Sequence, residues 1–202
     1  MCALDIEYDA LLNFFPSVRE ERTEDGLRLA VCEADGFAAV RCGVGKSAAA
    51  FSSDVLLDRY PELVCLYSFG MAGALSDTLD AGDIVLGTAA VDVEDGAVLE
   101  LMTPVERLQR SNGLHRGNIV CSPVFVDSEK QRVLYQKCFG GICAEMECAG
   151  VARSCRQRGV EAAAVKVISD RADSAAMASL LRAQISVTEK LGAWLHAVRE
   201  FL

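Results

Sequence analysis

Residues 162–173 read AAAVKVISDRAD, and the fold can be predicted by working outward from this stretch. Ala162 to Ser169 is apolar except for Lys166, which is typical of a strand buried on both faces of an α/β sheet. Asp170 follows directly, at the carboxyl end of that strand. Ligands of such sheets bind beyond the carboxyl ends of the strands. The stretch therefore predicts a central strand and places Asp170 where a ligand would bind.

The same alternation of strand and helix extends over most of the chain. Apolar runs bounded by glycine or proline predict further strands at 37–42, 63–69, 83–87, 118–126 and 141–145. Helical patterns lie between and after them, at 46–60, 128–138, 147–158 and 175–202. The stretch 92–116 is the least regular, and it is expected to be a surface loop. This order predicts an α/β fold with a mostly parallel sheet and helices on both faces.

The charge balance excludes several classes of partner. The 202 residues include 20 basic and 29 acidic side chains, which gives a net charge of −9. Such a chain lacks the attraction to phosphates that drives nucleic-acid binding, and anionic membrane surfaces repel it. It has no apolar run of membrane-spanning length and no secretory signal pattern at its start. We therefore expect a cytoplasmic protein without a nucleic-acid polymer or a membrane as partner.

The cysteines and histidines argue against a metal site. There are nine cysteines, no CxxC pair, and two histidines, His115 and His196, that are far apart. Most cysteines lie inside apolar runs, so they are expected to be reduced thiols that pack as small apolar side chains. No ligand spacing typical of zinc is present. The sequence predicts no metal.

The glycine-rich stretch Gly43-Val44-Gly45-Lys46-Ser47 resembles two phosphate-binding motifs without completing either. A P-loop requires glycine at position 40, where this chain has Val40. A dinucleotide-binding turn requires an acidic residue after the next strand, whereas Glu62 precedes that strand. The remaining interpretation from the residues alone is a tight turn between a strand and a helix, which needs the freedom of glycine.

Four segments stand in order at the ends of predicted strands. They are 42–46, 70–75 followed by 82–85, Glu145-Met146-Glu147, and 168–173. In this order and spacing the chain resembles the nucleoside phosphorylase superfamily. Its most similar branch is the 5'-methylthioadenosine/S-adenosylhomocysteine nucleosidases, and the resemblance covers nearly the whole chain.

The resemblance implies a fold and a class of partner. The expected fold is the phosphorylase-like, three-layer α/β/α arrangement, with a mixed, mostly parallel sheet in a single domain, 1–202. The expected partner is a small-molecule purine nucleoside, as in methionine salvage. The resemblance implies neither a metal nor an organic cofactor. It implies a homodimer. The family's first strand is expected to be missing, because the chain begins almost at the segment that follows it, and Glu7 is then expected to be poorly anchored.

The resemblance also assigns residues to the purine base. Asp170 matches the family's purine-binding aspartate, which could place a proton on N7 as a general acid. Ser169 precedes it, Phe125 matches an aromatic that stacks on the base, and Val126 offers backbone groups. Two structural alternatives remain for Asp170, because it could cap the last helix or pair with Arg171.

The sugar is assigned to the segment at 145–147. Glu147 matches the glutamate that accepts hydrogen bonds from the two ribose hydroxyls, a contact suited to a carboxylate with two oxygens. Met146 matches a residue against the sugar, and Glu145 could also face the site. The alternative is a helix N-terminus that carries acidic residues because they favour the helix dipole.

The nucleophile is expected to be water. Met71, Ala72 and Gly73 form the second glycine-rich stretch, where a phosphorylase needs hydroxyls and an arginine. Met71 and Ser68 stand there instead, and a thioether cannot donate hydrogen bonds to phosphate.

By resemblance, Glu7 is the general base that activates this water, with Asp5 as the fallback. Lys166 replaces an arginine near the water, and it keeps the charge without the fork of donors. The alternative for Glu7 is an acidic face on a first helix.

The sequence thus predicts an N-ribosyl hydrolase acting on an adenine-type nucleoside. The alternatives are a futalosine-type hydrolase, a nucleoside phosphorylase, and a nucleoside-binding homologue that has lost catalysis. A structural protein without a ligand is the remaining class.

Overall fold

The computed structural model describes residues 1–15, 17–102 and 114–198. Its centre is a sheet of six strands in the order β6-β5-β7-β8-β4-β9. The strands are β4 (Cys65–Ala74), β5 (Ile84–Asp92), β6 (Val98–Glu100), β7 (Leu114–Cys121), β8 (Gly141–Glu145) and β9 (Glu161–Asp170). The two longest runs of pairing, β4 with β9 and β5 with β7, are parallel. The sheet is therefore mixed, as expected.

The sheet closes on itself. β9 pairs in parallel with β4 along its length and also pairs antiparallel with β5. Strands β5, β7, β8, β4 and β9 thus form a ring, with β6 added at β5. Lys166 lies opposite Gly70 in this register, and Asp170 lies opposite Gly73. The register brings two of the predicted site segments together.

A second, antiparallel sheet contains β1 (Arg19–Arg22), β2 (Arg28–Cys32) and β3 (Phe37–Arg41). The start of the chain links it to the main sheet. Cys2 forms an isolated bridge with Arg41. Met1 accepts a hydrogen bond from the Phe69 amide and donates its ammonium to the Tyr67 carbonyl, both on β4. These bonds hold the residues that precede Glu7.

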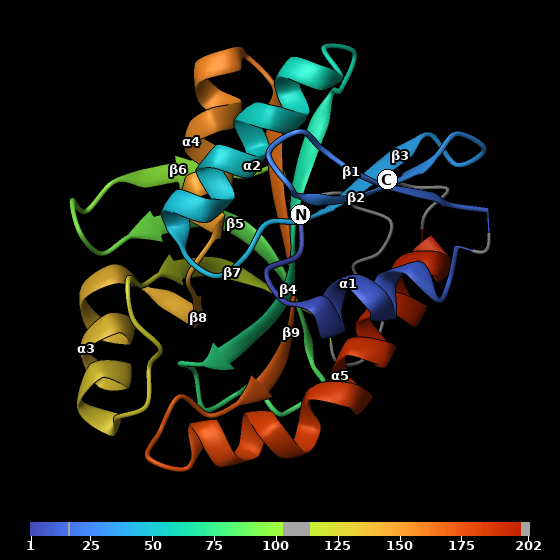
Figure 1. Cartoon of the computed structure of the whole chain (residues 1–202). Helices are drawn as coiled ribbons and strands as arrows, with labels where there is room; N and C mark the ends of the chain where they lie inside the picture. Colours follow the sequence, from blue (N-terminus) through green and yellow to red (C-terminus); the bar gives the residue numbers. More distant parts are fainter. Residues whose placement is uncertain (16, 103–113, 199–202) are drawn as a thin grey trace.

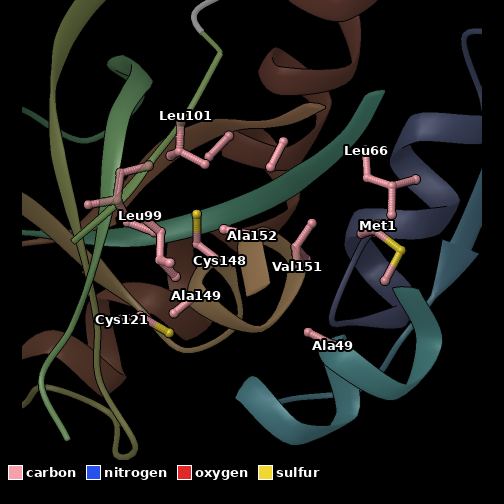
Figure 2. Packing of buried hydrophobic residues seen from close by; sticks show 14 of the residues in the cluster. Met1, Ala49, Leu66, Leu99, Leu101, Cys121, Cys148, Ala149, Val151 and Ala152 are labelled. Atoms are coloured by element: carbon pink, nitrogen blue, oxygen red, sulfur yellow. The ribbon is translucent and has the colours of Figure 1, made fainter. Parts of the chain in front are cut away.

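Helices lie around the main sheet (Figure 1). The helices are α1 (Asp5–Leu12), α2 (Lys46–Arg59), α3 (Glu129–Phe139), α4 (Cys148–Arg158) and α5 (Ala176–Val198). They pack through separate apolar clusters, of which two are large and a small one includes Tyr135 of α3. One large cluster joins α2 and α4 to the sheet and includes Leu66, Ala149 and Val151 (Figure 2). The other joins α1 and α5 and includes Tyr8, Phe69 and Leu191. Alternate residues of β4 and β9 serve the two clusters, as the two-residue period of a strand requires.

Several sequence-based boundaries are wrong. The strand predicted at 83–87 continues to Asp92, and the strand predicted at 118–126 begins at Leu114 and ends at Cys121. The strand predicted to end at Phe69 continues to Ala74, because Gly70 to Gly73 stay in register with β9 instead of forming a turn. The region 92–116, predicted to be a loop, contains β6 and the first residues of β7. Residues 103–113 of that region and 199–202 of the predicted last helix lie outside the described residues. Among those described, no helix combines the length and the apolar character needed to span a bilayer.

Candidate active site

Glu7 is firmly held, contrary to the expectation of a frayed terminus. It lies on the first turn of α1 and is only 4% exposed. Its Oε2 accepts hydrogen bonds from the amides of Ala3 and Leu4, both at 2.9 Å, and its Oε1 accepts from the Met71 amide at 2.8 Å. Burial raises the pKa of Glu7, while these amides and Lys166 oppose the rise. The result is a buried carboxylate in one fixed orientation.

The carboxylate of Glu7 fits because position 70 is glycine. A Cβ built there would lie 2.5 Å from Glu7 Oε1, which is closer than Cβ atoms come to other non-bonded heavy atoms. Gly70 therefore lets β4 pass beneath the carboxylate, and the next amide, that of Met71, can reach it. The sequence drew attention to the glycines of this strand but gave no sign of this contact.

Lys166 is buried in a network with two partners. Its Nζ lies 2.9 Å from Glu145 Oε2 and donates to Ser68 Oγ at 2.8 Å. Burial alone would lower the pKa of the Lys166 ammonium, but the carboxylates of Glu145 and Glu147 outweigh it and hold the pKa above its ordinary value. Glu145 also accepts from the amides of Glu147 and Cys148 at the start of α4. Lys166 is therefore charged and fixed.

Glu147 is positioned by the glycine-rich turn before α2. Its Oε1 accepts a hydrogen bond from the Gly45 amide at 2.7 Å. Gly45 has a φ of +102°, which a residue with a side chain rarely adopts. Burial and the neighbouring Glu145 raise the pKa of Glu147 to about 7. α4 approaches closely enough because Gly150 lies against the Lys46 carbonyl, where a Cβ would be 2.2 Å away.

Glu7, Glu147 and Lys166 meet at a small cavity of about 10 Å³. Its polar lining comes from Glu7, Ser68, Glu147 and Lys166, together with the thiol of Cys42. The volume matches about one water molecule, which needs roughly 10–15 Å³. A buried carboxylate beside such a space can accept a proton from water.

Asp170 lies farther along β9 from this cavity. It is four residues beyond Lys166, or about 13 Å at about 3.3 Å per residue. Its Oδ2 accepts from the Ser169 hydroxyl at 2.7 Å, and its Oδ1 accepts from the Ala172 amide at 2.8 Å. Burial raises the pKa of Asp170, and no cation contributes to the shift. A carboxyl group that holds its proton more strongly than usual is suited to act as an acid.

The two structural alternatives for Asp170 are not what the structure shows. Arg171 pairs instead with Asp80, at 2.5 Å. The amide of Ala175, just before α5, is bound by Asp173. Ala172, with a φ of +50°, turns the chain so that its amide faces Asp170. The turn after β9 is therefore built around the carboxylate of Asp170.

Comparison with known proteins identifies the family to which the chain belongs. A family model described as the phosphorylase superfamily matches residues 1–198. The chain belongs to this superfamily.

Curated relatives include the 5'-methylthioadenosine/S-adenosylhomocysteine nucleosidase of Staphylococcus haemolyticus. It is 28% identical over 173 residues, which are 74% of this chain and 72% of the relative. The enzyme of the same name from Staphylococcus aureus strain MRSA252 is 28% identical over 157 residues, 66% of this chain and 68% of the relative.

Solved structures share the fold at low identity. The Helicobacter pylori 5'-methylthioadenosine/S-adenosylhomocysteine nucleosidase with butyl-thio-DADMe-Immucillin-A has a TM-score of 0.87 at 19% identity, covering 100% of this chain and 96% of that one. The futalosine hydrolase of the same species also has a TM-score of 0.87 at 19% identity, with the same coverage. Both likenesses concern the fold.

The other predicted site residues of this superfamily member fall into two groups. Ala72 and Gly73 lie beside Asp170, since Ser169 Oγ is 3.3 Å from the Ala72 carbonyl and a Cβ at Gly73 would be 2.9 Å from Asp170 Oδ1. Met71 differs from expectation, because its side chain packs in the cluster with α1 and α5 and only its amide serves the site.

The remaining candidates lie in less constrained positions. Phe125 and Met146 are half-buried, and Val126 packs in a small apolar cluster with Tyr135. Asp5, the fallback base, forms ion pairs with Arg28 and Arg41 and is not among the residues that line the cavity.

Neither phosphate-binding alternative for the first glycine-rich turn fits the structure. Lys46, the residue that a P-loop would use, forms ion pairs with Asp92 at 2.6 Å and with Glu94. The turn instead gives the Gly45 amide to Glu147. Within residues 1–15, 17–102 and 114–198, no three histidine, cysteine, aspartate or glutamate side chains are grouped so that they could hold a metal ion.

Proposed function

We propose that the protein is an N-ribosyl hydrolase that cleaves adenine-type nucleosides such as methylthioadenosine or adenosylhomocysteine. The products are the free base and the pentose, and water is the nucleophile. The observation that carries this proposal is Glu7, a buried carboxylate that three backbone amides hold beside a cavity of the size of one water. The names of the curated relatives support the same substrate class.

In this mechanism Glu7 acts on the attacking water, and Asp170 acts on the purine base that leaves. Glu7 takes a proton from water while the water oxygen bonds to the anomeric carbon. Glu147 accepts hydrogen bonds from the ribose hydroxyls, with Met146 against the sugar. The bond to the purine breaks as its electron pair moves to the base. Asp170 supplies a proton or a short hydrogen bond at N7, so that the base leaves without a full negative charge.

The cavity favours hydrolysis over phosphorolysis. A space of about 10 Å³ has no room for a phosphate ion. Glu7 and Glu147 line it, and two carboxylates repel a dianion. The cations among the described lining residues already have partners: Lys166 pairs with Glu145, and the ammonium of Met1 donates to the Tyr67 carbonyl.

A futalosine-type hydrolase is the second candidate. Support for it comes from the Helicobacter pylori futalosine hydrolase, which has the same fold. The two candidates share the chemistry at the anomeric carbon and differ in the group attached at the 5' position.

The finer structural expectations belong to the same proposal. We infer a three-layer α/β/α arrangement, a homodimer, a cytoplasmic location and a role in methionine salvage. The exposed apolar residues Val44 and Phe51, at and within α2, would suit a contact between two copies. Light scattering coupled to size-exclusion chromatography tests the dimer, and a monomer at micromolar concentration would contradict it.

The test of the function is chromatographic analysis of products. The protein is incubated with methylthioadenosine, adenosylhomocysteine and aminofutalosine, each with and without phosphate. Release of the free base at the same rate in both buffers is expected, and the substrate that reacts fastest identifies the 5' group. Sugar phosphate that forms only with phosphate would identify a phosphorylase. Binding by calorimetry without base release would identify a homologue that has lost catalysis.

A further inference from the structure

Ser68 is a buried polar residue to which the mechanism above gives no task. It lies on β4, is 1% exposed, and lines the same cavity as Glu7. Its Oγ is 2.8 Å from Lys166 Nζ. An ammonium group can only donate hydrogen bonds, so the hydroxyl of Ser68 must be the acceptor in this contact. The proton of the hydroxyl is therefore directed elsewhere.

That proton has no acceptor in the described part of the protein. The hydrogen bonds of Ser68 side-chain atoms comprise only the one from Lys166. Buried hydroxyl groups normally donate as well as accept, because an unused donor away from water is costly. The cavity is the polar space that Ser68 lines. A molecule in the cavity that can accept a hydrogen bond would satisfy the donor.

Glu7 can also accept a hydrogen bond from a molecule in the cavity. Each carboxylate oxygen has about two positions for hydrogen bonds. Oε2 has two amide donors, those of Ala3 and Leu4, whereas Oε1 has one, that of Met71. Oε1 thus keeps one position for a further donor. Among the residues that line the cavity, Ser68 therefore has a spare donor and Glu7 a spare acceptor.

We propose that Ser68 orients the attacking water, a role that rests on the proposed hydrolysis. The water donates one proton to Glu7 Oε1 and accepts the hydroxyl proton of Ser68 on one lone pair. Its second lone pair is left to form the bond to the anomeric carbon. During the reaction the proton moves to Glu7, the C–O bond forms, and the C–N bond breaks with its electron pair going to the base. The proton of Ser68 does not transfer.

Lys166 acts through Ser68 in this arrangement. Two of the three N–H groups of its ammonium are used by Glu145 and Ser68. The contact with Lys166 fixes the hydroxyl as a donor toward the cavity, since Oγ cannot turn its proton toward a cation. The position of the buried Lys166 therefore sets the direction in which Ser68 donates its proton to the water. Lysine lacks the several planar donors of arginine. The hydroxyl of Ser68 adds one donor that faces the water.

The test compares Ser68→Ala with a matched control, Ser154→Ala. Ser154 is also buried, at 3% exposed, but its hydroxyl donates to the Ala50 carbonyl, away from the cavity. We expect Ser68→Ala to lower kcat about 10–100-fold, the effect of one lost hydrogen bond in a buried site, with KM within about threefold. The control should keep the kcat of the unaltered protein.

A second readout separates orientation of water from a structural effect. In a water–methanol mixture, methanol can replace water as nucleophile and give the methyl riboside. Loss of the Ser68 hydroxyl removes the donor that holds water and enlarges the cavity. The ratio of methyl riboside to free pentose should therefore rise in Ser68→Ala and stay unchanged in Ser154→Ala. Loss of folding stability alone would not alter this ratio.

Each outcome has a distinct meaning. A kcat within about twofold of the unaltered protein, with the same product ratio, would overturn the role of Ser68 and leave the hydrolase intact. If the unaltered protein releases no base from any nucleoside, both proposals fail. Should Ser68→Ala not fold, Ser68→Cys keeps an acceptor for Lys166 with a weaker donor. It is expected to lower kcat and raise the product ratio, and an unchanged kcat and ratio would contradict the proposal.

Discussion

The two ends of the site use buried carboxylates in opposite ways. At the nucleophile end, Glu7 and Glu145 lie near the cation Lys166 and are bound by several backbone amides. At the base end, Asp170 has one hydroxyl and one amide as partners and no cation. Burial raises the pKa of both Glu7 and Asp170, but only at the nucleophile end does a positive charge oppose it.

This difference shows how one residue type can serve two roles. A cation and three amides stabilise the ionised form of a carboxyl group, which is the form that accepts a proton. A carboxyl group without a cation keeps its proton longer and can donate it. The nucleophile end is also the more interdependent, because its charges compensate one another. Changes there should affect stability, whereas changes at Asp170 should affect chemistry.

The largest expected effect is that of Asp170→Asn. The substitution preserves shape but removes the acid, so kcat should fall by up to about 10⁴-fold. The melting temperature should change little, because an amide oxygen can still accept from Ser169 or Ala172. Chromatography of the released base measures kcat, and thermal unfolding measures the melting temperature. Asp173→Asn, three residues beyond Asp170, is the control and should retain activity.

Lys166→Met tests the charge compensation at the other end. It leaves Glu145 buried without its cation, which should lower the free energy of unfolding by about 3–5 kcal/mol. Denaturant unfolding measures this. Adding Glu145→Gln should recover part of the loss, because the uncompensated charge is then removed.

The control for this prediction is Lys130→Met, at an exposed position on α3, which should change the free energy of unfolding by about 0.5 kcal/mol or less. Equal effects of Lys166→Met and Lys130→Met would contradict the distinction between the two ends.

Gly150→Ala tests the close approach of α4 to α2. The new Cβ would meet the Lys46 carbonyl, so the helices must separate at a cost of about 1–3 kcal/mol. The shift also moves the Gly45 amide away from Glu147, so KM for the nucleoside should rise while Asp170 is unaffected. Arg156→Ala, exposed on the same helix, is the matched control. Unchanged stability and KM in Gly150→Ala would show that the glycine is not needed.

The smallest expected effect is a pH dependence of stability due to Glu147. Its pKa is about 7 in the folded protein against an ordinary value of 4.5, so the folded state binds this proton more tightly. The contribution of Glu147 to stability is then lost as the pH rises from about 4.5 to about 7. The melting temperature of Glu147→Gln, relative to the unaltered protein, should rise over this range and then level off. A difference that stays flat or falls would contradict the raised pKa.

Much of the fold could be predicted from local pattern. The strand at 162–169 and the helices at 46–60 and 128–138 agree with the structure to within a few residues, because their apolar periods and end signals are local. The closure of the sheet through β5 and β9 could not be predicted in the same way. It depends on pairing between strands far apart in the chain, and this pairing leaves no mark in either strand alone. Of the antiparallel sheet, the strand at 37–42 was predicted and corresponds to β3, but β1 and β2 were missed. β1 is polar throughout and therefore lacks an apolar period.

By itself, the sequence determined the order of strands and helices and the positions of the carboxylates at 145, 147 and 170, because chain order alone sets which residues follow a strand. Only the tertiary structure decided how those groups are held. Ser68 meets Lys166 across 98 residues, and the Met71 amide meets Glu7 across 64. Every residue except proline has a backbone amide, so the side-chain pattern cannot show which amide will face a carboxylate. That choice follows from the register of β4 against β9 and from glycines small enough to let the chains approach.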